Sequence, residues 1–306
     1  LFREFDAAGD VNEAWFSLKL GAHIMKQRLR YDGSQEAQSL RSWMQEIEQG
    51  PDVARVGESG PIFIVGMPRT GTTLLDRILS NHPDIESLGE RNDFSAAVSE
   101  ASDCFFDSLL KTTRDGVLQR LDFDRAGKLY LARLRRAPGS TRFVIDKNPK
   151  NLFNIPLILR AIPNARVLCL MRDPTDSCFS NLKELFQGGA YPYSYALDDL
   201  AEHCMLAHEW IRYWAAAAPS AVRVVRYEEL VANPDQVIEP LLKFIGADFH
   251  SGLTDIESNE APVSTASSSQ VRESIHVRGV GAWARYEKHL QPLRERLAQL
   301  GERVDS

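Results

Sequence analysis

Residues 61–75, PIFIVGMPRTGTTLL, carry the pattern that decides the fold. The stretch opens with an apolar, β-branched run that ends at Gly66, and Gly71, Thr72 and Thr73 follow before an apolar helical run. This order predicts a strand, a loop and a helix whose first backbone N–H groups and dipole form an anion site. The spacing G-x-x-x-x-G-T-T is that of a nucleotide phosphate loop, except that Thr72 stands where such a loop has its lysine.

The same loop carries an arginine, Arg69, that a nucleotide phosphate loop does not need. Its planar, always charged guanidinium can bind two oxygens at once, which suits a phosphate that is held and not transferred. The segment resembles the 5′-phosphosulfate-binding loop of sulfotransferases, enzymes that use 3′-phosphoadenosine-5′-phosphosulfate (PAPS) and release the desulfated product PAP. The resemblance implies that the donor is bound by Pro68, Arg69, Thr70, Gly71, Thr72 and Thr73.

An arginine and a serine eight residues apart form a second match. Arg172 ends a buried-strand run in 166–180, RVLCLMRDPTDSCFS, and Asp173 with Pro174 predicts the start of a helix that carries Ser180. In the sulfotransferase family, an arginine after a strand and a serine eight residues later bind the 3′-phosphate. The resemblance implies this role for Arg172 and Ser180, whereas the pattern alone also fits an exposed arginine and a helix serine.

Lys147 follows a short predicted strand, 143–145, in the stretch FVIDKNPKN. Ligands of open α/β sheets bind beyond the carboxyl ends of the strands, so Lys147 is placed to reach one. It resembles the catalytic lysine of the family, which would neutralise the charge that grows on the bridging oxygen as the sulfuryl group leaves. Lys150, three residues later, is the competing candidate.

The general base must differ from that of the small-molecule sulfotransferases of the cytosol, which have a histidine two residues after the lysine. This chain has Pro149 there. Glu90, 21 residues after Arg69, is the best candidate, because tyrosylprotein sulfotransferases carry a catalytic glutamate at that spacing and bacterial sulfotransferases with tetratricopeptide repeats (TPRs) have a similar Gly-Glu pair. A partly desolvated carboxylate can deprotonate a hydroxyl. The alternative for Glu90 is a helix N-terminus, where its charge would complement the dipole.

Two later segments resemble the family less sharply. Tyr227 follows the β-rich run 222–226, where the family has a tyrosine near the nucleotide; a buried core tyrosine is the alternative. The serine- and glycine-rich stretch 264–283, STASSSQVRESIHVRGVGAW, matches the region that supplies a basic residue to the 3′-phosphate. Arg272 is the expected residue, and Arg278 stays open.

Composition sets the bounds on the class of protein. The 306 residues suffice for one large α/β domain with additions, and a formal charge of −6 argues against broad binding to nucleic acid or membranes. None of the four cysteines forms a C-x-x-C pair, so we expect no zinc site and no disulfide framework. No run approaches the roughly 18 apolar residues of a membrane span. We therefore expect a cytoplasmic protein without a metal requirement, a nucleic-acid partner or a membrane span.

Residues 1–50 are predicted to form a separate helical, TPR-like segment. Gly9 and Ala14 match the G-x-x-x-x-A turn of a TPR, and a predicted helix, 12–30, follows. One partial repeat cannot bury its faces alone, so the segment is either the last repeat of an array or an ordinary helical hairpin. The resemblance to bacterial sulfotransferases with TPRs covers roughly residues 5–300 and implies a protein partner for the N-terminal helices.

The remaining pattern predicts the domain 55–306. Strands alternate with helices, which indicates parallel βαβ units in a P-loop-type three-layer α/β/α sandwich. The predicted strands lie near 61–66, 142–146, 165–171 and 221–226, and the helices near 71–81, 150–161, 174–186 and 198–217. A helical insert, 92–138, and the loop 187–195 are expected to border the acceptor site.

Together the motifs predict transfer of a sulfuryl group from PAPS to a hydroxyl by in-line displacement, with Lys147 and Glu90 as catalytic residues. The acceptor stays open among a peptide tyrosine, a glycan and a small-molecule alcohol. One competing hypothesis is a P-loop kinase-like phosphotransferase, which would use ATP and magnesium. The other is a non-catalytic module that binds a nucleotide or a partner.

Overall fold

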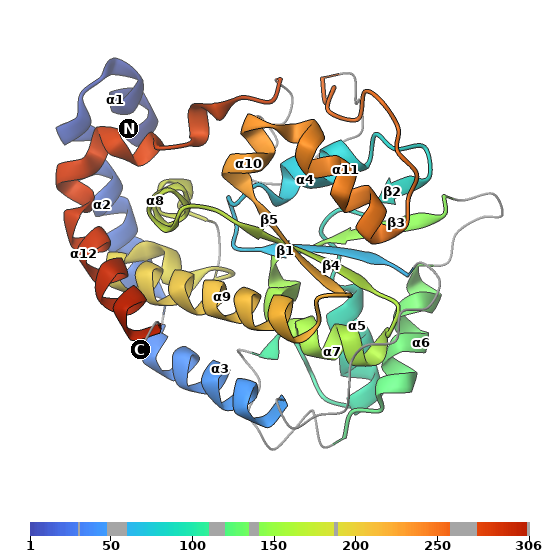
Figure 1. The fold of residues 1–306 in the computed structure, drawn as a ribbon. Helices are drawn as coiled ribbons and strands as arrows, with labels where there is room; N and C mark the ends of the chain where they lie inside the picture. The colour runs from blue at the N-terminus through green and yellow to red at the C-terminus, as the bar shows by residue number, and fades with distance from the viewer. Residues whose placement is uncertain are drawn as a thin grey trace. The chain divides into compact units, whose positions relative to one another are not determined.

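The computed structural model describes residues 1–29, 31–47, 60–109, 120–134, 141–186, 189–257 and 274–304. Within these residues, five strands form one fully parallel sheet in the order β2-β3-β1-β4-β5 (Figure 1). The strands are β1 (Ile62–Gly66), β2 (Ile85–Ser87), β3 (Phe143–Lys147), β4 (Arg166–Met171) and β5 (Val222–Arg226). The predicted α/β fold with a central parallel sheet is confirmed, with β2 as an additional short edge strand.

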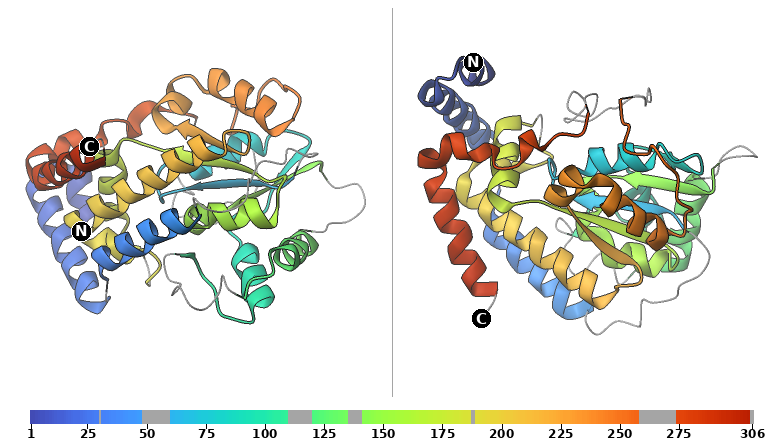
Figure 2. Two further views of the ribbon diagram at one scale, coloured as in Figure 1. Left: turned by 60° about the horizontal axis from the view of Figure 1, so that its bottom comes forward. Right: turned by 45° about the horizontal axis from the view of Figure 1, so that its top comes forward.

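Helices cover both faces of this sheet, as Figures 1 and 2 show. One face is covered by α4, α10 and α11, and the opposite face by α5, α6 and α7. Their bounds are α4 (Thr72–Leu79), α5 (Asp93–Ser102), α6 (Phe123–Arg133), α7 (Ile155–Ala161), α10 (Tyr227–Ala232) and α11 (Pro234–Ile245). A 3₁₀ turn, Pro149–Asn154, precedes α7, so the helix predicted near 150–161 is split in two.

The residues of β1 alternate between two apolar layers, because successive side chains of a strand point to opposite faces. Ile62 and Ile64 belong to a core cluster that includes residues of α4 and α11. Phe63 instead packs against Phe94 of α5 and Tyr130 of α6, with ring centroids 6.0 and 5.4 Å away. Burial of both faces explains why β1 reads as a continuous apolar run.

The chain divides into two compact units. The sheet unit consists of 39–171 and 210–276 and contains all five strands. The helical unit consists of 1–38, 172–209 and 277–306. It contains α1 (Phe2–Ala8), α2 (Val11–Arg28), α8 (Pro174–Glu184) and α12 (Glu287–Val304), while α3 (Gly33–Ile47) and α9 (Leu197–Ala217) have residues in both units.

In the helical unit, α2 starts at a capped turn. Gly9 adopts a left-handed conformation after α1, and the Asp10 side chain accepts a hydrogen bond from the Glu13 N–H at 3.1 Å. Trp15 of α2 then stacks on His289 of α12 at a centroid distance of 5.1 Å. The helix predicted over 12–30 is therefore present, whereas the assignment of residues 1–50 to a TPR and their boundary stay predictions.

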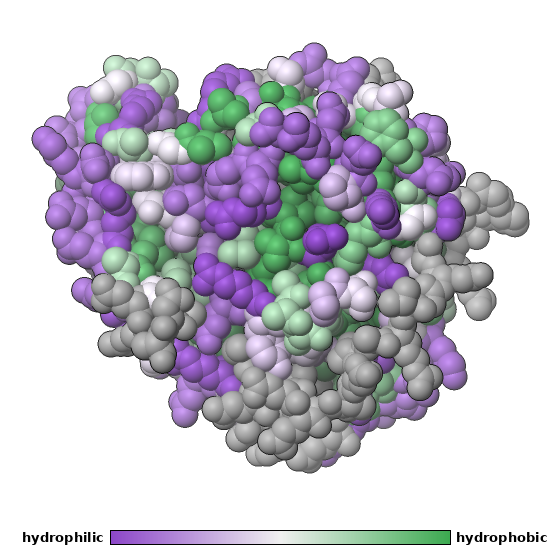
Figure 3. Space-filling view, viewed as in Figure 1, coloured by the Kyte–Doolittle hydropathy of each residue, from purple (hydrophilic) through white to green (hydrophobic). Residues whose placement is uncertain are grey.

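On the face drawn in Figure 3, hydrophilic residues predominate over the helical unit. Among the described residues, no helix combines the length and the apolar character that crossing a bilayer requires.

Candidate active site

The phosphate-type loop leaves β1 and turns sharply before α4. The Thr70 hydroxyl donates to the Met67 carbonyl at 2.7 Å, and Thr70 is buried. Arg69 and Gly71 both have positive φ, 68° and 100°, which folds the loop back on itself. Since α4 begins at Thr72, the loop ends at a helix start, where the first N–H groups have no intrahelical acceptor. The predicted loop and helix start are thus both present.

Tyr227 packs directly on this loop. It is the first residue of α10 and follows β5. A Cβ atom added to Gly71 would lie 2.6 Å from the Tyr227 ring, closer than real Cβ atoms come to any neighbour. Two features therefore require glycine at position 71: its left-handed backbone conformation, and the close approach of the Tyr227 ring, which leaves no room for a side chain. The structure thus places Tyr227 against the loop, and its role near a nucleotide stays a prediction.

Lys147 and Glu90 form an ion pair, although they are 57 positions apart in the sequence. The Lys147 Nζ lies 2.6 Å from the Glu90 Oε1. The Lys147 side chain is only 1% exposed, whereas that of Glu90 is 36% exposed. A buried ammonium is costly without a nearby carboxylate, so Glu90 is the group that compensates the charge of Lys147, and it does so from a position that solvent can reach.

The backbone of the β2–β3 ladder brings Glu90 to this position. The Leu88 N–H donates to the Ile145 carbonyl at 2.8 Å, and the Lys147 N–H donates to the Gly89 carbonyl at 3.1 Å. Gly89 then takes a positive φ of 67°, which turns the chain. The pairing thus extends past the end of β2 and places Glu90 beside the last residue of β3.

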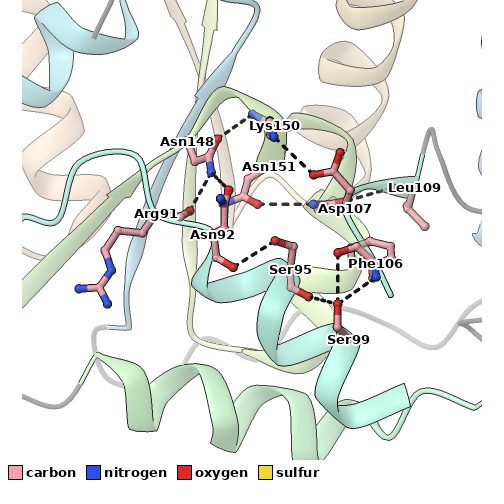
Figure 4. Close-up of polar contacts among 11 residues, drawn as sticks. Arg91, Asn92, Ser95, Ser99, Phe106, Asp107, Leu109, Asn148, Lys150 and Asn151 are labelled. Atoms are coloured by element: carbon pink, nitrogen blue, oxygen red, sulfur yellow. Dashed lines mark hydrogen bonds and ion pairs between the residues drawn. The ribbon is translucent and has the colours of Figure 1, made fainter. Parts of the chain in front are cut away.

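Figure 4 shows how the chain is fixed just beyond Glu90. The Asn148 side-chain amide donates to the Arg91 carbonyl at 2.7 Å and to the Asn92 Oδ1 at 3.3 Å, while its own Oδ1 accepts from the Lys150 N–H at 3.1 Å. The Lys150 Nζ pairs with Asp107 at 3.5 Å. The competing lysine therefore contacts a different carboxylate, and Lys147 is the one that contacts Glu90.

Asp76 is a third charged group at this site, and the sequence reasoning missed it. It lies in the second turn of α4, near Lys147, Glu90 and Arg77. Burial raises the pKa of Asp76 to about 6, against the opposing effect of the polar Ser87 side chain and of the two cations. The available signal was its position four residues after Thr72, which places it on the helix face that carries the loop residue.

Asp146, the neighbour of Lys147, belongs to the opposite face of the sheet. Its carboxyl group accepts a hydrogen bond from the Tyr130 hydroxyl at 3.0 Å and one from the Asn151 amide at 3.4 Å. Burial raises the pKa of Asp146 to about 7, which the Tyr130 hydrogen bond opposes. Asp146 therefore anchors the end of β3 within the core.

Arg172 lies two residues before α8, in the helical unit, and is buried. Its guanidinium donates to the Gly279 carbonyl and lies 3.8 Å from the Asp176 carboxylate. That carboxylate also accepts hydrogen bonds from the Gly281 and Trp283 N–H groups, at 2.7 and 3.3 Å. The segment around Gly279 is thus fixed to the first turn of α8 by both side chains.

Asp173 caps α8, as predicted, because its side chain accepts a hydrogen bond from the Asp176 N–H at 2.9 Å. Ser180 lies on the same helix and is half-buried. Arg278 is exposed and directly precedes Gly279, the residue whose carbonyl Arg172 contacts. Arg272 lies outside the described residues, so its predicted role stays a prediction.

The candidate site residues predicted from the sequence thus belong to two groups, one in the sheet unit and one in the helical unit. The sheet unit contains the loop 67–73 with Tyr227 and the Lys147–Glu90 pair, all at the carboxyl edge of the sheet. The helical unit contains Arg172, Ser180 and Arg278. In the described part of the chain, no group of three or more His, Cys, Asp or Glu side chains is arranged to bind a metal ion.

The two segments expected to border the acceptor site, 92–138 and 187–195, are each described for some of their residues. Within the insert 92–138, the described residues form α5 and α6. Within the loop 187–195, residues 192–195 form a 3₁₀ turn. Their role at an acceptor site stays a prediction.

Comparisons with known proteins give one consistent family. Residues 61–251 match the profile described as the sulfotransferase family. A protein of Aquifex aeolicus (strain VF5), described as uncharacterized, is 28% identical over 98% of this chain, which spans 41% of that protein. Human protein-tyrosine sulfotransferase 1 is 24% identical over 89% of this chain, which spans 77% of it.

Two solved structures share the fold. The sulfotransferase domain from the curacin biosynthetic pathway has a TM-score of 0.54 at 18% identity, and the match covers 82% of this chain and 99% of that one. The sulfotransferase domain of the Synechococcus PCC 7002 olefin synthase has a TM-score of 0.51 at 20% identity, with 84% and 98% covered.

Proposed function

Because this chain belongs to the sulfotransferase family, we propose that it transfers a sulfuryl group from PAPS to a hydroxyl acceptor. The observation that carries the proposal is the 2.6 Å contact between Lys147 and Glu90 at the carboxyl edge of the sheet. In this contact, a cation that would stabilise the leaving group lies beside a carboxylate that is 36% exposed and would accept the proton. The chain spans less than half of its Aquifex relative, so the proposal concerns the activity of these residues only.

The loop that follows β1 supports 5′-phosphosulfate as the group bound there. Thr72 and Thr73 open α4, and Arg69 lies in the preceding turn. Helix-start N–H groups and a guanidinium stabilise an anion without needing a metal ion or a loop lysine. Tyr227, packed on Gly71, would shape the same site from the side of β5.

Arg172 and Ser180 are the proposed ligands of the 3′-phosphate. Both lie on or just before α8, whose first turn is capped by Asp173. Arg172 contacts a carbonyl and a carboxylate in this structure, and a phosphate would compete with both for the guanidinium. Arg272 or Arg278 would supply a further cation.

The proposed reaction is a single in-line displacement. The acceptor oxygen forms a bond to sulfur while the bond between sulfur and the bridging oxygen breaks, and the electron pair of that bond stays on the 5′-phosphate of PAP. Glu90 takes the acceptor proton, and Lys147 stabilises the charge on the departing oxygen. The products are a sulfate ester, PAP and a protonated Glu90.

A peptide tyrosine is the acceptor to test first, because several relatives are named protein-tyrosine sulfotransferases. A phenol, with a reference pKa of about 10, also gives up its proton more easily than an aliphatic alcohol. Glycans and small-molecule alcohols are the remaining candidates.

The experiment that tests the donor class is calorimetric titration of PAP into the protein without metal, followed by transfer from labelled PAPS to a tyrosine peptide, a glycan and a simple alcohol. Loss of a hydrogen bond to a charged group costs about 1.5–3 kcal/mol, so Arg172→Ala should weaken PAP binding roughly 10- to 100-fold. Arg212→Ala, which removes an exposed arginine of α9, is the matched control and should bind like the wild type. Absence of PAP binding together with magnesium-dependent ATP turnover would instead support the kinase hypothesis.

A further inference from the structure

Two consecutive residues at the end of β3 hold the backbone on both sides of Glu90. The Lys147 N–H donates to the Gly89 carbonyl at 3.1 Å, and the Asn148 side-chain amide donates to the Arg91 carbonyl at 2.7 Å. Gly89 and Arg91 are the two neighbours of Glu90 in the chain. The proposed base therefore lies between two carbonyl groups that are both hydrogen-bonded to the segment carrying the proposed catalytic lysine.

The Asn148 side chain is buried, at 6% exposure, and all its polar atoms are used (Figure 4). Besides the bond to the Arg91 carbonyl, its amide nitrogen donates to the Asn92 Oδ1 at 3.3 Å. Its Oδ1 accepts from the Lys150 N–H at 3.1 Å and so caps the 3₁₀ turn Pro149–Asn154. A buried amide whose donors and acceptor all have partners is held in one orientation.

Asn92 gives an independent sign of the same connection. It stands at the N-cap of α5, where an asparagine side chain usually accepts a hydrogen bond from the first turn of the helix. No such capping bond is present in α5, and the Asn92 Oδ1 accepts from Asn148 instead. The segment between Glu90 and α5 is thus fixed to Asn148 by a side chain as well as by a backbone carbonyl.

Glu90 depends on these contacts because it lies between the end of β2 at Ser87 and the start of α5 at Asp93. Its carboxylate is 36% exposed, yet its Oε1 must stay 2.6 Å from the Lys147 Nζ to compensate that buried charge. An in-line transfer tolerates little displacement of a reacting group. A neutral amide can fix the backbone here without adding a charge beside the ion pair.

We propose that Asn148 is a positioning residue for the base: together with the Lys147 N–H it holds the backbone on both sides of Glu90 and so keeps the Glu90 carboxylate beside the Lys147 ammonium. This inference rests on the proposed function. Asn148 acts through Glu90, so its loss should lower the turnover number and leave the affinity for PAP and the KM for the acceptor unchanged.

Asn148→Ser tests this role while preserving the turn after β3. A serine hydroxyl can still accept from the Lys150 N–H as an N-cap, but it is too short to reach the Arg91 carbonyl. We expect kcat to fall on the order of 10- to 100-fold, the scale of loss that a displacement of about 1 Å causes. Asn148→Thr, which can cap the same turn, is the second variant and should behave alike. The control, Asn233→Ser, changes an exposed asparagine before α11 that makes no capping hydrogen bond.

A double-mutant cycle with Glu90→Gln distinguishes positioning from a general structural role. Once the base is gone, nothing is left for Asn148 to position, so Asn148→Ser should lower the residual kcat of Glu90→Gln by less than about threefold. A merely structural role would lower kcat by the same factor in both backgrounds. Single-turnover transfer from labelled PAPS measures all four proteins of the cycle.

The closing experiment adds amide hydrogen exchange of the protein without nucleotide, followed by NMR at the Lys147 N–H. Its acceptor is the Gly89 carbonyl, so loosening of the turn at Glu90 in Asn148→Ser should speed its exchange on the order of tenfold. Faster exchange, together with a loss of kcat that disappears in Glu90→Gln and an unchanged PAP affinity, is the expected result. Unchanged exchange, or an equal loss of kcat in both backgrounds, overturns the inference. Absence of PAP binding and of transfer in the wild type would instead overturn the proposed function, and the exchange rate would still decide whether Asn148 holds the Glu90 turn.

Discussion

Replacing Glu90 with glutamine should separate its chemical role from its structural one. Glutamine keeps an oxygen acceptor for the Lys147 Nζ, which lies 2.6 Å from the Glu90 Oε1, but it cannot take a proton from an acceptor. Loss of a general base typically lowers the rate by about 10²- to 10⁴-fold, or roughly 3–5 kcal/mol in activation free energy. We expect a loss of kcat in that range and an unchanged affinity for PAP.

Replacing Glu90 with alanine should add a cost in stability. Breaking a fully buried ion pair costs about 3–5 kcal/mol, but Glu90 is 36% exposed, and solvent screening reduces this figure. We expect a decrease of about 1–2 kcal/mol in the free energy of unfolding. For a chain of 306 residues, with an unfolding entropy of about 2.1 cal/mol/K per residue, that corresponds to a fall of roughly 1.5–3 °C in Tm, whereas glutamine should leave Tm within about 1 °C.

Single-turnover transfer from labelled PAPS, calorimetric PAP titration and thermal unfolding together check both variants. Asp84→Asn, an exposed change in the same region, controls for nonspecific effects of removing a carboxylate. If Glu90→Gln kept its turnover within about threefold of the wild type, the assignment of the base would be refuted, since a general base typically contributes about 10²- to 10⁴-fold. An unchanged Tm in Glu90→Ala would refute the structural part of the reasoning alone.

Two further predictions concern the loop and the core. Gly71→Ala should weaken PAP binding at least tenfold. The added Cβ would lie 2.6 Å from the Tyr227 ring, and the φ of 100° at this position is unfavourable for alanine. Calorimetric PAP titration checks this, and an unchanged affinity would count against the loop as the donor site. Asp146 has a pKa of about 7 in the native state and an ordinary value of 3.8 in the unfolded chain. Between these two pH values, the native state holds a proton that the unfolded chain has released. The free energy of unfolding should therefore fall as pH rises from 4 to 7, by up to about 4 kcal/mol. Asp146→Asn keeps an acceptor for the Tyr130 hydroxyl but cannot titrate, so its unfolding free energy should change less with pH. Urea unfolding at pH 5 and pH 8 measures this. An equally steep pH dependence in the variant would show that other groups cause it.

Much of the sheet could be predicted from local sequence. Strands β1 and β4 are apolar over their full length because both faces are buried, and this signal does not depend on distant residues. The start of α8 carries its own cap, Asp173, followed by Pro174. The loop after β1 was equally clear, because its glycines and threonines lie next to one another in the chain.

What sequence could not give is the pairing of distant residues. β2 has only three residues, one buried, one exposed and one intermediate, so its alternation of apolar and polar residues is too short to distinguish a strand from a turn. Yet the register of β2 on β3 decides that Glu90 lies beside Lys147. Asp76 was missed for the same reason, because an acidic residue in an amphipathic helix usually faces solvent, and only the packing of α4 shows that one of its carboxylate oxygens is shielded from solvent.

The strand order itself explains why this fold suits the proposed reaction. The loop follows β1, Lys147 ends β3 and Glu90 follows β2, and these three strands are neighbours in the order β2-β3-β1. Adjacent strands lie about 4.8 Å apart, so the base and the loop are separated by roughly 10 Å with the lysine between them. An in-line transfer needs that sequence of groups, with the donor phosphate on the loop, the cation at the bridging oxygen and the base at the acceptor. A switch in the order of β2 and β3 would keep every motif in the sequence and yet remove Lys147 from between the base and the loop. The chemistry therefore depends on the topology of the sheet as much as on the motifs.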